Sequence, residues 1–248
     1  MATPNACPDR SGSEPGVFSP ETTPLPCLFM RPTSGWFWRR LALFAALAVL
    51  SAAALPLDKF LAQWGVHDHC PPSLGKLLQL TEVFGHGFGV LLIGLTVFTL
   101  DPVRRWAVPR LLFVAVGSGM MADVIKVVVA RARPRNAGLG ASALDVLHGW
   151  MAHPGGGAKL QSFPSGHAAA SMGLALALGA LYPRGRWLFF SLAFLSACQR
   201  VEEGAHFPSD VLFGAAVGTL VATACLYGGP IARWFDRREI ALRGVNRR

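Results

Sequence analysis

The chain has 248 residues, of which 52% are hydrophobic and only 15% are charged. Soluble domains average about 25% charged residues, so this chain has too little polar surface for a water-soluble body, and we expect a helical membrane protein. The net charge of +9 could suggest nucleic-acid binding, but the arginines lie in short clusters between apolar stretches. Without a long basic face, we expect no nucleic-acid partner.

In chain order, residues 1–33 are rich in Pro, Ser, Thr and Gly and are predicted to form a disordered cytoplasmic arm. Residues 34–232 hold six apolar runs, most of them near the ~20 residues that cross a bilayer. The first run could pass for a signal peptide, but its polar lead is long, so we expect an uncleaved span. The runs are Leu41–Leu57, Val83–Leu100, Leu111–Ala130, Pro164–Tyr182, Trp187–Cys198 and Val211–Tyr227.

Clusters of arginine fix the expected orientation. With six spans, the clusters at 39–40, 104–110, 184–186 and the basic tail 233–248 all fall on one side, which the positive-inside rule makes cytoplasmic. The long loop 136–162 and three polar stretches then face outward. The segment from Asp58 to Leu80 is predicted to lie along the outer interface.

The first polar stretch is Lys126-x6-Arg133-Pro134. Lys126 and Arg133 are two helical turns apart, so they are predicted to lie about 10 Å apart along one helical stripe and to reach one anion, with Pro134 ending the helix at Arg133. The simpler alternative is snorkelling of interfacial basic residues. Asp123 could pair with Lys126. Two further arginines are interpreted as rim residues that attract anionic headgroups: Arg131 and Arg135.

The second stretch is Pro164-Ser165-Gly166-His167, at the start of the fourth apolar run. The first turn of a helix has unpaired N–H groups at its positive end, so Ser165 and Gly166 are predicted to cradle an anion beside His167. The alternative is an ordinary capped helix with an incidental histidine.

The third stretch is Arg200-x5-His206-x3-Asp210, between the last two runs. A spacing of four lets Asp210 accept the Nδ1–H of His206 and leave Nε2 free to attack, while Arg200 supplies a further cation. The alternative is a polar extracellular loop. Two other residues could line the same pocket and contact a headgroup, or pair with each other inside the bundle: Glu82 and His86.

Together, these three stretches closely resemble the motifs of the type 2 phosphatidic acid phosphatase superfamily, which also contains the vanadium haloperoxidases. The likeness covers Lys126 to Asp210. It implies an all-α, six-transmembrane helix bundle with the active site at the outer ends of helices 3–6. It further implies an integral protein of the bacterial inner membrane whose site faces the periplasm.

The resemblance also implies roles for individual residues. His206 would be the nucleophile that forms a phosphohistidine, Asp210 would orient it, and His167 would be the general acid. The phosphate would be bound by Lys126, Arg133, Ser165, Gly166 and Arg200. The expected activity is metal-independent hydrolysis of a lipid phosphate monoester or diphosphate, with no cofactor.

One residue departs from the family pattern, and two other classes of function stay open. Gln199 replaces the serine that commonly precedes this arginine in the family, which puts the local geometry in doubt. The same fold could hold vanadate and oxidise halide, or bind or transport lipid without catalysis.

Five cysteines without C-x-x-C spacing predict neither a metal nor a redox site: Cys7, Cys27, Cys70, Cys198 and Cys225. The sequence does not fix the oligomeric state or the particular lipid.

Overall fold

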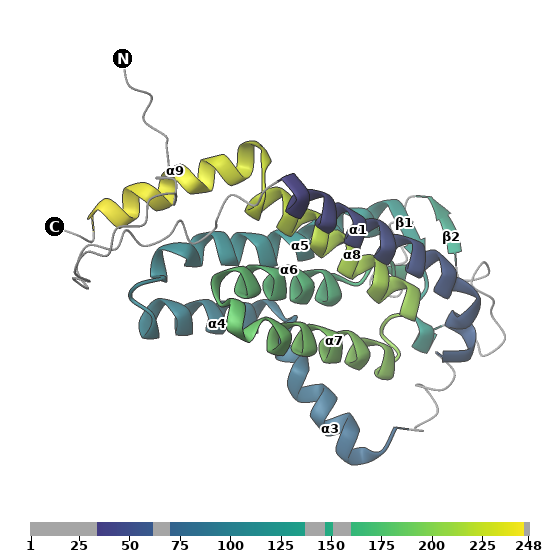
Figure 1. Ribbon diagram of the computed structural model, residues 1–248. Helices are drawn as coiled ribbons and strands as arrows, with labels where there is room; N and C mark the ends of the chain where they lie inside the picture. The colour runs from purple at the N-terminus through teal and green to yellow at the C-terminus, as the bar shows by residue number, and fades with distance from the viewer. Residues whose placement is uncertain (1–33, 62–69, 137–146, 151–159, 246–248) are drawn as a thin grey trace.

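The computed structural model describes residues 34–61, 70–136, 147–150 and 160–245. This part of the chain forms a bundle of long helices with a small sheet at one end, where the α5–β1 junction lies, and helix α9 at the other (Figure 1). The predicted arm 1–33 lies outside the described residues. The helices are α1 Ser34–Ala54, α3 Pro72–Thr81, α4 Gly87–Leu100, α5 Val108–Val128, α6 Gly166–Leu181, α7 Arg186–Glu202, α8 Pro208–Leu226 and α9 Gly229–Val245.

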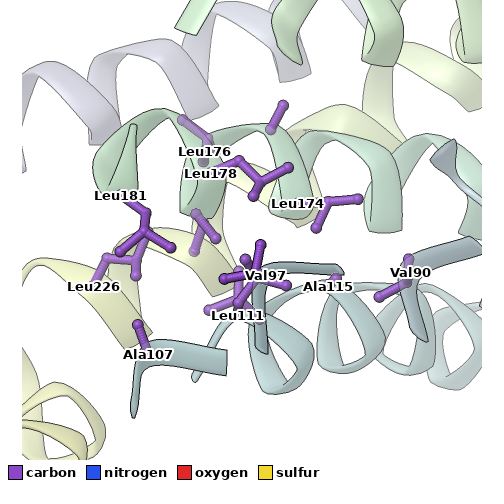
Figure 2. Packing of buried hydrophobic residues seen from close by; sticks show 14 of the residues in the cluster. Val90, Val97, Ala107, Leu111, Ala115, Leu174, Leu176, Leu178, Leu181 and Leu226 are labelled. Carbon is purple, nitrogen blue, oxygen red and sulfur yellow. The ribbon is translucent and has the colours of Figure 1, made fainter. Parts of the chain in front are cut away.

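Helix α6 is the centre of the bundle and packs against α5, α7 and α8. It consists almost entirely of Ala, Leu and Gly, so it is apolar on every side, as a helix surrounded by other helices should be. Its leucines meet Val90 and Val97 of α4, Leu111 of α5 and Leu226 of α8 in one continuous core (Figure 2). Burial of this core fixes how the ends of α5, α6, α7 and α8 lie relative to one another.

Helices α6 and α8 approach closely because α8 carries glycine where they cross. A Cβ at Gly214 would lie 2.4 Å from the carbonyl oxygen of Ser165, and one at Gly218 would lie 2.3 Å from that of Ala169. Both distances are too short for a side chain. The Gly-x-x-x-Gly spacing that lets membrane helices approach closely therefore operates here.

Three described helical segments are long and apolar enough to cross a membrane: Phe37–Leu61, Arg105–Val128 and Pro208–Leu226. A fourth span results if Pro72–Phe84 and Gly87–Leu100, which meet at 66°, count as one. The 16 residues of α6 would extend about 24 Å, less than the ~30 Å hydrocarbon core. The six predicted runs are mainly helical, but the count of six spans stays a prediction.

Large apolar side chains cover the outside of the bundle. On α4 and α5 they include Phe88, Leu95, Phe98, Met120 and Val124, each more than half exposed. In water, an apolar surface of this kind would favour aggregation, whereas lipid chains would solvate it. The chain is therefore an integral membrane protein by composition and by surface.

The predicted all-α architecture holds for most of the described residues, but a short two-stranded sheet follows the end of α5. The helix stops at Val128, and β1 (Val129–Arg131) pairs antiparallel with β2 (Leu147–Trp150). The Lys126–Arg133 segment is thus not one helical stripe, since the chain turns extended five residues before Pro134. The three consecutive valines at this junction, Val127 to Val129, fit this change, because β-branched side chains favour extended backbone.

The opposite end of the bundle holds most of the predicted cytoplasmic arginines. Arg110 is fully buried and pairs with Asp236 at 2.6 Å and with Glu239 at 2.8 Å, both on α9. The predicted basic tail is therefore, as far as Val245, a helix that contributes acidic partners to the bundle. Arg110 acts as a structural ion-pair partner as well as a member of an arginine cluster.

Orientation can be tested by cysteine labelling. In a chain whose native cysteines are replaced by serine, we expect Asn136→Cys, at the sheet end, to react with a membrane-impermeant maleimide in intact spheroplasts. Arg237→Cys, exposed on α9, should react only after lysis. The reverse pattern would place the sheet end in the cytoplasm.

Candidate active site

The three polar stretches meet at the sheet end of the bundle. The end of α5 brings Lys126, the start of α6 brings His167, and the turn between α7 and α8 brings His206. Two backbone hydrogen bonds tie them together: Ser165 N–H donates to Asp210 O at 3.0 Å, and Arg135 N–H donates to Gly204 O at 3.1 Å. Three stretches that are far apart in the sequence thus form one site.

The N-terminus of α6 is arranged differently from the prediction in one respect. The Ser165 hydroxyl caps the helix by accepting from Ala168 N–H at 3.4 Å, while its own N–H is taken by Asp210. Ser165 is therefore not a free backbone donor. The N–H groups of Gly166 and His167, in the first turn, have no acceptor within the helix. The free N–H groups at this helix end are therefore those of Gly166 and His167 and not that of Ser165.

Lys126 lies directly over this helix end. A Cβ at Gly166 would be 3.3 Å from its Nζ, so glycine leaves the space that the ammonium group approaches. The predicted pairing with Asp123 is confirmed, at 2.8 Å. Lys126 is mostly buried while Asp123 is largely exposed, so the pair is open to solvent on the carboxylate side.

Arg133 adds a second cation from the segment after β1. Its Nε is buried without a hydrogen-bond partner among the described residues, which is unusual for a guanidinium. Burial lowers the pKa of Arg133, and the charges of Arg135 and Arg200 lower it further. Positive charge therefore gathers here, as an anion site requires.

Arg200, the third cation, is held near the end of α7. Its Nε donates to Oε1 of the buried Gln199 at 2.5 Å, and its Nη2 pairs with Glu203 at 2.7 Å. The glutamine that departs from the family pattern thus fixes the guanidinium. Gly204, at φ 64, then ends the helix in the left-handed region and turns the chain towards His206.

The imidazole of His206 is oriented by a residue that the sequence did not indicate. Its Nδ1 lies 2.7 Å from the carbonyl oxygen of Ser162, whereas Asp210 Oδ2 is 3.9 Å away. The predicted hydrogen bond to Asp210 is therefore replaced by one to Ser162. A carbonyl oxygen only accepts, so Nδ1 carries the proton and Nε2 keeps its lone pair.

Asp210 supports the imidazole indirectly, through the residues that hold it. Its carboxylate accepts from Ser162 Oγ at 2.5 Å and from Phe207 N–H at 2.9 Å, and it pairs with Arg131. It is completely buried. Asp210 thus holds Ser162 and the turn that carries His206, and adds negative charge near the imidazole.

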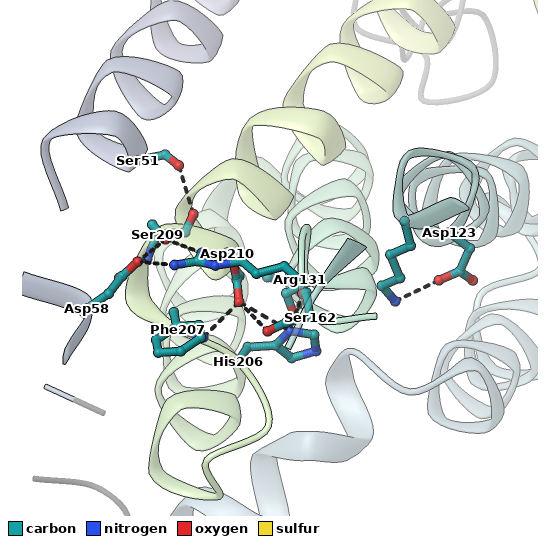
Figure 3. A network of polar contacts seen from close by, with 12 residues as sticks. Ser51, Asp58, Asp123, Arg131, Ser162, His206, Phe207, Ser209 and Asp210 are labelled. Atoms are coloured by element: carbon teal, nitrogen blue, oxygen red, sulfur yellow. Dashed lines mark hydrogen bonds and ion pairs between the residues drawn. The ribbon is translucent and has the colours of Figure 1, made fainter. Parts of the chain in front are cut away.

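Arg131, interpreted above as a rim residue, is 1% exposed and is the centre of this network (Figure 3). Besides Asp210, it contacts Asp58 at 2.7 Å and Ser209 Oγ at 2.8 Å. Asp58, expected at the membrane interface, is fully buried and accepts from the backbone and hydroxyl of Ser209 at the start of α8. The network therefore joins the end of α1 to the site.

Glu82 and His86 do not pair with each other. Oε1 of Glu82 lies 2.8 Å from Arg200 Nη2 and 3.7 Å from His167 Nε2. Nδ1 of His86 accepts from Phe88 N–H at 3.2 Å and so caps α4, while its ring centroid lies 5.8 Å from that of His167. Of the two residues, Glu82 is the one in contact with the phosphate-site candidates.

Within the described ranges, no group of three or more His, Cys, Asp or Glu side chains is arranged to hold a metal ion. Cys70, Cys198 and Cys225 are free thiols, whereas Cys7 and Cys27 lie outside the described residues. Much of the 136–162 loop lies outside as well. What the described residues bring together is three cations, two histidines and the N-terminus of α6.

Comparison with known proteins places this site in a family. A model described as the PAP2 superfamily matches residues 107–234, more than half of the chain and all three stretches. The chain belongs to the PAP2 superfamily. In fold, it is similar to a PAP2-type phosphatidylglycerolphosphate phosphatase from Bacillus subtilis, with a TM-score of 0.52 and 21% identity over 74% of this chain and 92% of that one.

Two relatives are rhizobial proteins named lipid A 1-phosphatase. The chain is 35% identical to that of Rhizobium johnstonii over 117 residues, which cover 46% of this chain and 44% of the relative. It is 29% identical to that of Rhizobium etli over 189 residues, covering 68% and 77%. The chain thus spans less than half the length of the first relative and about three quarters of the second.

The Arg131 network yields a stability prediction. Arg131→Met would leave Asp58 and Asp210 buried without their cation, and we expect it to lower the free energy of unfolding by about 3–5 kcal/mol. Thermal unfolding in detergent measures this. The matched control is Arg135→Met, which removes an exposed 3.7 Å pair with Glu203 and should cost less than about 1 kcal/mol. Equal losses would mean that the network carries little stability.

A second prediction concerns the protonation of His206. Burial lowers its pKa and outweighs Asp210, which raises it, while Arg133 and Lys126 lower it further. A lowered pKa keeps the imidazole neutral at neutral pH, so its signal in ¹⁵N-histidine NMR should titrate below the usual value of about 6.5. The signal missing from His206→Ala identifies it. Titration above that value would show that Asp210 dominates.

Proposed function

We propose that this chain is an integral membrane phosphatase that hydrolyses a lipid phosphate through a phosphohistidine. The observation that carries the proposal is the convergence of Lys126, Arg133 and Arg200 on the two histidines at one end of the bundle. A phosphoryl group needs its charge held by fixed donors while one group attacks and another protonates the leaving oxygen.

In the first step, Nε2 of His206 attacks phosphorus. The bond to the ester oxygen breaks, and His167 donates a proton to that oxygen, which leaves as a lipid alcohol. The charge that develops on the phosphoryl oxygens is compensated by the three cations and by the N–H groups at the start of α6. The Ser162 carbonyl and the negative charge of Asp210 stabilise the imidazole as it becomes positive.

In the second step, water attacks phosphorus and His206 leaves. His167, deprotonated by the first step, takes the proton from this water, so the enzyme returns to its starting state and inorganic phosphate is released. Every group in this scheme is a side chain or backbone group of the chain. We therefore propose that the reaction requires neither metal nor cofactor.

The exposed apolar surface supports a lipid substrate whose chains remain in the bilayer. We further propose six spans and a site facing the periplasm. Because two relatives are named lipid A 1-phosphatase, a lipid A phosphate is the first substrate to test.

A phosphate-release panel tests the function. Purified protein in EDTA should release phosphate from at least one of phosphatidate, phosphatidylglycerol phosphate, a polyprenyl diphosphate and lipid A. Release from none of them, or release that depends on a divalent ion, would contradict the proposal. Vanadate-dependent halide oxidation would instead favour the haloperoxidase alternative.

The roles of the two histidines can be separated by the leaving group. His206→Ala should lower turnover at least about 10³-fold for any phosphate ester, because the covalent route is lost. His167→Ala should impair a lipid alkyl phosphate strongly but p-nitrophenyl phosphate much less, since nitrophenolate leaves without a proton. The thermal transitions of both variants serve as folding controls. If His167→Ala lost the same fraction of activity on the lipid phosphate and on p-nitrophenyl phosphate, the assignment of His167 as the acid would be contradicted.

A further inference from the structure

Glu82 occupies a position between two groups of the proposed phosphate site. A single oxygen, Oε1, lies 2.8 Å from Nη2 of Arg200 and 3.7 Å from Nε2 of His167. Arg200 would bind the phosphate and His167 would protonate the oxygen that leaves it. A carboxylate oxygen that contacts both lies where an oxygen of the substrate phosphate would be expected.

The backbone holds Glu82 in this place. It begins the 3-10 turn Glu82–Phe84 at the 66° bend between α3 and α4. The turn packs tightly against the site, because a Cβ at Gly85 would lie 2.8 Å from the carbonyl oxygen of His167 and 2.9 Å from Ser196 Oγ. The backbone that carries Glu82 is therefore packed closely against the site.

Arg200 already has two carboxylates at ion-pair distance. Its Nη2 is within ion-pair distance of both Glu82 and Glu203, while its Nε donates a hydrogen bond to Gln199 Oε1. A phosphate dianion placed against the same guanidinium would lie within a few ångströms of the Glu82 carboxylate, and like charges repel strongly at that distance. Either Glu82 withdraws or the anion binds less tightly.

We propose that Glu82 competes with phosphate for Arg200 and so limits how tightly the site retains inorganic phosphate. The inference rests on the proposed function, in that phosphate must bind at Arg200. A site with three cations and a helix N-terminus favours the product anion as well as the substrate, and tight product binding slows turnover. A lipid substrate has chains in the bilayer to hold it, whereas inorganic phosphate has only the ionic contacts.

The test is the affinity for inorganic phosphate and for vanadate, measured by calorimetry on the purified protein in detergent at fixed ionic strength. Glu82→Gln keeps the shape and a hydrogen-bond acceptor but removes the charge. We expect it to lower the dissociation constant of both anions roughly fivefold, the size of one partly exposed ion pair. In an Arg200→Met background, the same substitution should have a clearly smaller effect, because the shared partner is gone and only the direct repulsion between Glu82 and the anion remains.

The matched control is Glu202→Gln, which makes the same change of net charge on α7. The Glu202 carboxylate lies next to Gly75 of α3, at 3.4 Å from a Cβ built there, and no described contact joins it to Arg200. Its dissociation constant for phosphate should stay within about twofold of the parent.

Three results would overturn the proposal. The dissociation constant could be unchanged or raised in Glu82→Gln, which would mean that Glu82 supports the site. It could fall equally in Glu202→Gln, which would indicate only a general effect of net charge. The third such result is that neither the parent protein nor the Glu82→Gln variant binds phosphate or vanadate, which would mean that there is no anion site at Arg200. Binding requires no turnover, so a negative phosphate-release panel with positive binding would reject the proposed activity and leave this inference standing.

Discussion

The buried ion pairs of Arg131 with Asp58 and Asp210 connect the bundle to its site. Three fully buried charges are costly to remove from water, and they are tolerated only when each is compensated by good geometry. Here the compensation comes from segments distant in sequence: the end of α1, the strand after α5, and the start of α8. The backbone of Ser162 also donates to the carbonyl of Arg131 at 2.9 Å, so the loop before α6 joins the same assembly. The position of His206 depends on all of these contacts.

Two layers of charge result, with different consequences. In the inner layer, the carboxylates of Asp58 and Asp210 are satisfied by Arg131, serine hydroxyls and backbone N–H groups. In the outer layer, Lys126 and Arg200 have carboxylate partners that are partly exposed, and Arg133 has none among the described side chains. Exposed ion pairs are weak and easily exchanged. The inner layer can therefore give rigidity while the outer layer accepts an anion.

Much of the helical architecture was predictable from sequence, because runs of apolar residues report burial in lipid or in other helices directly. The three polar stretches were also predictable as one site, since their residue types match one chemistry. The strand after α5 was not, because three valines extend an apolar run without indicating the conformation. Arg131 and Asp58 were assigned to the surface because a charge in sequence does not reveal a partner 73 residues away. Ser162 orients His206 through its backbone carbonyl, a group that every residue has, so no sequence signal could have singled it out.

The glycines of α8 have a consequence beyond packing. The proposed acid lies on the first turn of α6, and the proposed nucleophile lies just before α8, so the gap between them depends on how near the two axes come. The close approach is possible because Gly214, which faces the carbonyl of Ser165, has no Cβ. The spacing of the two proposed groups thus depends on a close contact between α6 and α8. A larger residue at Gly214 would force the two helices apart and so change the spacing of acid and nucleophile without changing any group that meets the substrate.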